Sequence, residues 1–174
     1  MVLFITIAIL ATKRGDSYAL FVCIGLVFCA IGDYTLQWFI VGLSFFLTGH
    51  VFYIIAFTRK KGSTPVSAKW LLVLYSTAML IWLVSTLLER GEMVLAIAVI
   101  AYIAVITTMG WTSFRTNNRF AIGAALLFIF SDSVLAVNRF IFDIPAAHEL
   151  IMFSYYGAQL LFALSISKFH NTTI

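Results

Sequence analysis

Long apolar stretches alternate with short polar breaks along almost the whole chain. Several stretches run for about 18 residues or more, which is enough for a helix to cross a hydrocarbon core of about 30 Å. We therefore predict an all-α protein, a polytopic bundle of transmembrane helices that forms a single integral membrane domain over residues 1–174. The pattern shows seven apolar segments, at residues 1–12, 17–38, 40–58, 68–88, 92–113, 119–138 and 148–168.

Composition agrees with this interpretation. The chain is 63% hydrophobic and only 10% charged, whereas an ordinary soluble domain is about a quarter charged. The net charge of +4 does not indicate a nucleic-acid partner, because the basic residues lie in short loops between the apolar segments. Cys23 and Cys29 lie in one apolar segment and are interpreted as small buried hydrophobes rather than as a metal or redox motif.

The basic residues also divide unequally between the two ends of the segments. Nine fall on one side of the predicted bundle, and only Arg90 and Arg139 fall on the other. Under the positive-inside rule this asymmetry places the C-terminus in the cytoplasm and the start of the first segment outside. One further helix ahead of Met1 would return the N-terminus to the cytoplasm. The nine are Lys13, Arg14, Arg59, Lys60, Lys61, Lys69, Arg115, Arg119 and Lys168.

Two aspartates lie at the ends of apolar runs. Asp33 ends the run at residues 19–33, and Asp132 ends the run at residues 121–132. A carboxylate in lipid costs about 2.5 to 3.5 kcal/mol on insertion scales, so it is expected to face a partner, a water-filled cavity or a substrate. We expect both in the outer half of the membrane at similar depth, as a candidate acid/base pair. The alternative is structural pairing with Arg139 or with a tyrosine.

Other polar residues are expected around this pair. Arg139 follows Asp132 by about two helical turns, and its planar fork suits a phosphate group; the alternative is an interfacial snorkelling residue. Gln37 lies one turn above Asp33, where a hydrogen bond to the carboxyl group is possible. The remaining candidate substrate-binding residues are Asn138, His50, Tyr53, Tyr155, Tyr156 and Gln159.

No metal or cofactor is expected. The three histidines, His50, His148 and His170, fall at different depths and cannot gather around zinc, which takes about three protein ligands plus water. The sequence also contains no nucleophile elbow, Walker loop or dinucleotide-binding glycine motif.

Two blocks of sequence resemble a known family. The first comprises Gly32–Leu36 and Gly42–Phe57, and the second is Gly123–Phe140. In an all-helical membrane chain, this combination resembles the YhhN/TMEM86 family of lysoplasmalogenases. The resemblance implies a family-like eight-helix bundle, of which this chain shows seven segments with a short or missing first helix.

The resemblance also implies a reaction. The vinyl ether bond of a lysoplasmalogen would be hydrolysed to a fatty aldehyde and glycerophospho-ethanolamine or -choline, with Asp33 and Asp132 as the functional aspartates. Vinyl ether hydrolysis needs a protonated acid and an ionised carboxylate, as does the related oxocarbenium chemistry of glycosidases. We assign the acid to Asp33, in the more apolar setting, and the ionised role to Asp132. The expected partners are a lysophospholipid substrate and membrane lipid, and the expected location is the bacterial inner membrane.

Two other functions use the same residues. In a proton- or cation-coupled transporter of small molecules or lipids, the aspartates would relay protons or bind the cation. In a non-catalytic receptor or assembly factor, they would serve packing. Replacement of either aspartate by asparagine separates the packing role from catalysis, because a packing role tolerates the amide and acid/base chemistry does not.

Overall fold

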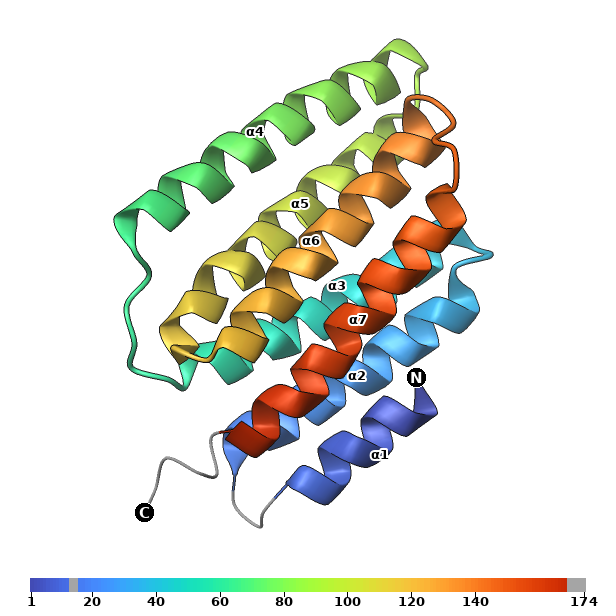
Figure 1. Cartoon of the computed structure of the whole chain (residues 1–174). Helices are drawn as coiled ribbons and strands as arrows, with labels where there is room; N and C mark the ends of the chain where they lie inside the picture. The colour runs from blue at the N-terminus through green and yellow to red at the C-terminus, as the bar shows by residue number, and fades with distance from the viewer. Residues whose placement is uncertain (13–15, 169–174) are drawn as a thin grey trace.

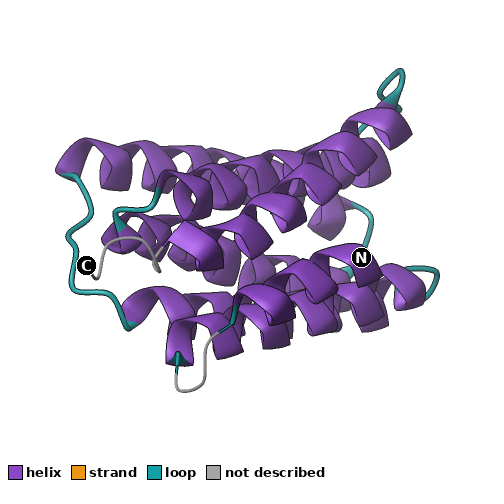
Figure 2. Cartoon of the chain, turned by 60° about the horizontal axis from the view of Figure 1, so that its bottom comes forward, coloured by secondary structure: helices purple, strands orange, loops and turns teal. Residues whose placement is uncertain are grey.

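The computed structural model describes residues 1–12 and 16–168, and within these ranges it contains helices and loops but no strand (Figures 1 and 2). Lys13, Arg14 and His170, which entered the predictions, lie outside the described residues. The helices are α1 (Val2–Ala11), α2 (Ser17–Thr35), α3 (Phe39–Thr58), α4 (Val66–Glu89), α5 (Met93–Ser113), the short 3-10 helix η1 (Phe114–Thr116), α6 (Arg119–Phe140) and α7 (Ala147–Lys168).

Six of the described helices, α2 to α7, are long and apolar enough to cross a membrane. This confirms the predicted polytopic helical bundle, and the chain is an integral membrane protein. The remaining helix, α1, has 10 residues, which is about half a membrane span at 1.5 Å per residue.

The bundle is made of packed helical hairpins. The closest pairs are α2 with α3, α6 with α7, and α4 with α5, as the short loops require. In Figure 1, α4 forms one edge of the bundle and α1 lies at the opposite edge, where it packs against α2 and α7. α4 packs mainly on α5 and to a smaller extent on α6.

The turn between α2 and α3 corrects one predicted boundary. The second segment was expected to continue to residue 38, but α2 ends at Thr35, and the N–H of Trp38 donates to the Thr35 carbonyl at 2.9 Å. The turn is tight because Gly42 lies against it, where an added Cβ would come 2.7 Å from the Cα of Leu36. Gln37 therefore lies exposed in the turn rather than on the helix face above Asp33.

Glycines also set the close approach of α2 and α3 below this turn. A Cβ at Gly25 would lie 2.4 Å from the ring of Tyr53, and one at Gly49 would lie 2.9 Å from the sulfur of Cys29. Neither position has room for a side chain without displacing its neighbour. Small residues let membrane helices pack closely, and here they place Tyr53 and the adjacent His50 in the interior of the bundle.

Candidate active site

A largely apolar cavity lies among α3, α4, α5 and α6. Its internal space is about 70 Å³, and it is open on one side. Most of its walls are aliphatic and phenylalanine side chains, and its polar groups belong to the five residues Tyr75, Ser76, Tyr102, Asp132 and Ser133. A space of this kind suits a mainly apolar ligand with one polar group.

Asp132 supplies the carboxyl group that lines this cavity, and it is hydrogen-bonded to Tyr102. The hydroxyl of Tyr102, on α5, donates a hydrogen bond to Oδ2 of Asp132 on α6. Asp132 lies eight residues before the end of α6 at Phe140, and Tyr102 lies nine residues after the start of α5 at Met93. Because the two helices are antiparallel neighbours, these positions fall at the same height.

Sequence reasoning missed Tyr102. The available signal was a single phenol in the middle of the apolar segment 92–113, at a depth that matches Asp132. A buried tyrosine usually finds a hydrogen-bond partner for its hydroxyl, so a mid-membrane carboxylate on a neighbouring helix was a candidate acceptor.

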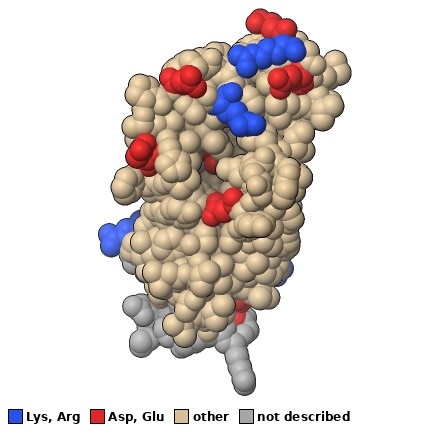
Figure 3. Space-filling model, turned by 90° about the vertical axis from the view of Figure 1, so that its right-hand side faces the viewer, with Lys and Arg blue, Asp and Glu red and all other residues tan. Residues whose placement is uncertain are grey.

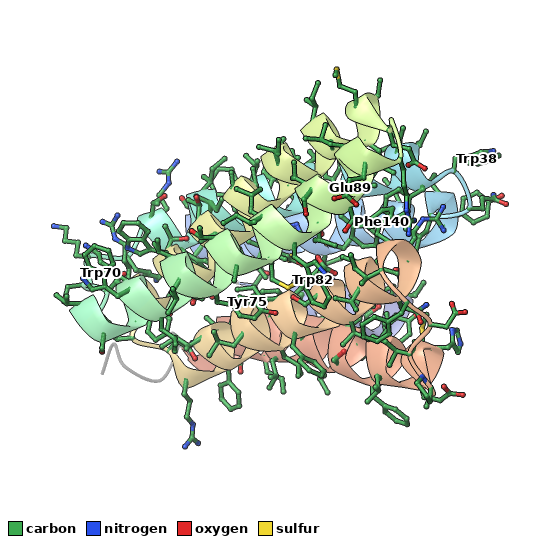
Figure 4. All side chains as sticks on the ribbon, turned by 90° about the horizontal axis from the view of Figure 1, so that it is seen from above. Trp38, Trp70, Tyr75, Trp82, Glu89 and Phe140 are labelled. Atoms are coloured by element: carbon green, nitrogen blue, oxygen red, sulfur yellow. The ribbon has the colours of Figure 1, made fainter. Side chains whose placement is uncertain are left out.

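The cavity extends to the seam between α4 and α6. There the hydroxyl of Tyr75 donates to Oγ of Ser133 at 2.7 Å, and Ser133 directly follows Asp132. Tyr75 is 40% exposed, so this hydrogen bond lies at the outer surface of the bundle. Figure 4 shows Tyr75 and Trp82 along the side of α4 next to α6. The side chains at this seam separate the cavity from the surroundings of the protein.

Asp33 lies in different surroundings. It does not line the cavity, and it lies close to Tyr155 on α7, whose hydroxyl donates to the carbonyl of Cys29 at 3.3 Å. Within the described residues, its buried Oδ2 has no hydrogen-bond partner. The residue before it, Gly32, faces the ring of Phe46, which would lie 3.1 Å from an added Cβ. Phe46 also lines the cavity, so its ring contacts both this end of α2 and the space beside Asp132.

A cluster of rings links the two regions. His50 is fully buried, and its ring centroid lies 4.5 Å from that of Phe128 and 5.5 Å from that of Tyr102. The ring of Phe128 in turn lies 5.3 Å from that of Tyr155. Among the described residues, neither ring nitrogen of His50 has a hydrogen-bond partner. His50 thus contacts the tyrosine that holds Asp132 rather than either carboxyl group.

Three other predicted site residues lie on the Asp33 side. Tyr53 donates its hydroxyl to Oε1 of Gln159 at 2.8 Å, which joins α3 to α7 inside the bundle. Tyr156 packs its ring against Phe4 of α1 at 6.3 Å and against Tyr155 at 5.1 Å. None of the three lines the cavity beside Asp132.

The predicted common groove of Arg139 and Asp132 is not found. Arg139 lines a separate groove at the end of the bundle, and its guanidinium carbon lies 4.4 Å from the ring centroid of Phe39. Phe39 lines both spaces. Its ring contacts Arg139 and also the ring of Phe140, and the centroids of the two rings lie 5.5 Å apart. Asn138 accepts a hydrogen bond from the N–H of Ile144 at 2.7 Å and so supports the loop after α6.

Figure 3 shows the face of the bundle at the right of Figure 1, where acidic and basic side chains surround a hollow. In the part of the chain that the structure describes, no three histidine, cysteine or carboxylate side chains gather in a way that would hold a metal ion.

Six apolar helices, four of which surround an apolar cavity with a carboxylate–tyrosine pair, define an integral membrane protein. The chain belongs to the YhhN family, which it matches over residues 1–166. This confirms the family resemblance carried by the two aspartate blocks.

The relatives have informative names. The chain is 35% identical over 157 residues to lysoplasmalogenase TMEM86A of Homo sapiens. The aligned region covers 82% of this chain and 63% of that protein. It is 35% identical over 158 residues to lysoplasmalogenase TMEM86B of Rattus norvegicus, with 89% and 65% covered. The chain thus spans less than two thirds of the length of these relatives. No solved structure matches it.

Proposed function

We propose that this protein hydrolyses the vinyl ether bond of lysoplasmalogens, releasing a fatty aldehyde and glycerophospho-ethanolamine or -choline. The observation that carries the proposal is the Asp132–Tyr102 pair, which sits in an apolar cavity at the α4–α6 seam. The names of the relatives support the same reaction. A single-chain lipid suits the cavity. Its hydrocarbon tail matches the apolar walls, and its ether oxygen would lie beside Asp132 and Tyr102, which are polar.

Asp132 acts on the reacting bond in this proposal. Proton addition to the β-carbon of the vinyl ether gives an oxocarbenium ion, water adds to the carbon bonded to oxygen, and the resulting hemiacetal breaks into aldehyde and glycerol hydroxyl. An ionised Asp132 stabilises the cation and takes a proton from the attacking water. The hydrogen bond donated by Tyr102 supports this assignment, because an O–H donor stabilises a carboxylate.

Asp33 is the proposed acid. Its unpaired buried oxygen supports a neutral carboxyl group there, since a carboxylate oxygen without a donor is costly to bury. Phe46 packs against Gly32 and also lines the cavity, so its ring contacts both regions. We therefore propose that substrate binding displaces Phe46 and joins the two carboxyl groups into one site.

The charge distribution supports a topology for this reaction. With the nine basic residues on the cytoplasmic side, the C-terminus is cytoplasmic and the site lies in the outer half of the bilayer, in a bacterial inner membrane under this proposal. A lysolipid would then reach the cavity sideways from the outer leaflet, with its phosphate toward Arg139.

The test is a comparison of three C16 lysophospholipids that differ only in the linkage at the first glycerol carbon: alkenyl ether, alkyl ether and ester. Purified protein in D2O should release aldehyde from the alkenyl lipid alone, with one deuterium on the carbon next to the carbonyl, and EDTA should not change the rate. Fatty acid release from the ester, or no product from folded protein, would contradict the proposal and favour another lipid reaction or transport.

A further inference from the structure

The groove that holds Arg139 is a second feature of the molecule, distinct from the cavity beside Asp132. It lies at the end of the bundle, between the α2–α3 turn and the start of α5. Its charged and aromatic side chains are Arg139, Glu92, Trp38 and Phe39, and exposed aliphatic side chains such as Met93 and Val94 complete its rim. One groove therefore offers a cation, an anion and two aromatic rings at the edge of an apolar surface.

Arg139 is positioned for an anion. Its guanidinium group is stacked over the ring of Phe39, and no ion pair or hydrogen bond of Arg139 is found among the described residues. Stacking fixes the plane of the guanidinium group and leaves the N–H groups at its edge free to bind. A planar fork of this kind binds a phosphate through paired hydrogen bonds.

Glu92 and Trp38 are the side chains of this groove that attract a cation. Glu92 is an exposed carboxylate at the N-terminal boundary of α5, and it lines the same groove as Arg139 without pairing with it. Trp38, at the tip of the α2–α3 turn, is 58% exposed. A carboxylate attracts an ammonium group, and a tryptophan face attracts both ammonium and quaternary ammonium groups. Opposite charges that share a groove but do not pair suit a ligand that carries both charges.

The groove also stands at a suitable distance from the reacting carboxylate. Arg139 follows Asp132 by seven residues on α6, which is about 10 Å along the helix axis. In a lysoplasmalogen, seven covalent bonds separate the phosphorus atom from the vinyl β-carbon. Phe39 lines the groove and the cavity together, so a lipid passing its ring would place phosphate at Arg139 and the vinyl ether near Asp132.

We infer that this groove is the headgroup site for a zwitterionic phospholipid, with the phosphate on Arg139 and the ammonium group on Glu92 and Trp38. The inference rests on the proposed function for the identity of the lipid. The site discriminates headgroups: it favours phosphoethanolamine and phosphocholine over a phosphate that carries no amine.

The experiment measures binding and turnover separately. Binding uses non-hydrolysable hexadecyl-ether lysolipids with ethanolamine, choline or no group on the phosphate, added to the full chain in maltoside detergent, which carries no competing charge. Turnover uses the matching alkenyl lipids. The variants are Glu92→Gln, Arg139→Ala and Trp38→Leu, and Glu89→Gln is the matched control, because Glu89 is an exposed acid at the nearby end of α4.

Glu92→Gln should weaken binding of the two amine-bearing lipids about three- to fivefold and leave the amine-free lipid unchanged or tighter. Arg139→Ala should weaken all three about tenfold or more. Trp38→Leu should affect choline most, and Glu89→Gln should change nothing. Equal effects of Glu92→Gln on all three lipids, or none, would overturn the inference. Headgroup-selective binding without aldehyde release would keep it and reject the proposed reaction instead.

Discussion

The two intramembrane aspartates differ in what surrounds them. Asp132 accepts a hydrogen bond from Tyr102 and lines a cavity that extends to the α4–α6 seam. Asp33 lies near the end of α2, close to Tyr155 on α7 and outside that cavity. The same residue type thus lines an apolar cavity in one half of the bundle and lies outside that cavity in the other. Position relative to the cavity, rather than burial, distinguishes the residue that is proposed to meet the substrate.

The largest effect is expected from the carboxyl groups. Asp132→Asn keeps the size of the side chain but removes its acid/base chemistry, so aldehyde release should fall about 100- to 10,000-fold. Asp33→Asn should lower aldehyde release by a similar factor, because the proposed reaction uses both carboxyl groups. The matched control is Asp143→Asn, in the exposed loop after α6, which should behave as wild type. Full activity in Asp33→Asn would leave Asp132 as the sole catalytic carboxylate.

A smaller effect is expected from Tyr102→Phe, which removes the hydroxyl that holds Asp132 and keeps the ring. Hydrogen bonds to charged groups contribute about 1.5 to 3 kcal/mol, so kcat should fall roughly 10- to 100-fold with little change in KM. The pH profile of kcat should move as well, because the carboxyl group loses a donor. An unchanged kcat would show that Tyr102 serves packing alone.

Filling the cavity should give an effect that depends on chain length. Ala136→Phe adds a ring to the cavity wall, and it should lower turnover of C16 substrates about tenfold while C8 substrates lose less. Leu74→Phe is the matched control, since Leu74 lies on α4 and is 71% exposed. Equal losses at all chain lengths would argue that the tail lies elsewhere.

The smallest effect on activity is expected from Tyr18→Phe. Tyr18 is a buried tyrosine on α2 whose hydroxyl shares a 2.7 Å hydrogen bond with Ser165 on α7. Its loss should lower the free energy of unfolding by about 1 kcal/mol and leave kcat unchanged per folded molecule. Thermal unfolding followed with the aldehyde assay separates the two quantities. A fall in kcat comparable to that of Tyr102→Phe would remove the contrast between the two halves of the bundle.

The sequence predicted the helical segments well because apolar length is a one-dimensional property. The boundary at Thr35 was missed, since it depends on Gly42 packing against the turn. Asp33 and Asp132 were recognised because a charge in an apolar run is conspicuous, but which of them lines the cavity depends on how the helices pack. Tyr102 was missed because a tyrosine in an apolar segment is unremarkable until a carboxylate is known to face it. The separation of Arg139 from Asp132 also depends on a third side chain, Phe39.

The most direct test of the central claim, that the cavity beside Asp132 holds the reacting bond, is photolabelling with a non-hydrolysable ether lysolipid whose diazirine lies next to the ether oxygen. Mass spectrometry of the labelled protein then locates the attached carbon. The account predicts labels on the cavity-lining parts of α4, α5 and α6, around Tyr75, Tyr102 and Ser133. Labels confined to α2 and α7 around Asp33, with none on α5 or α6, would contradict it.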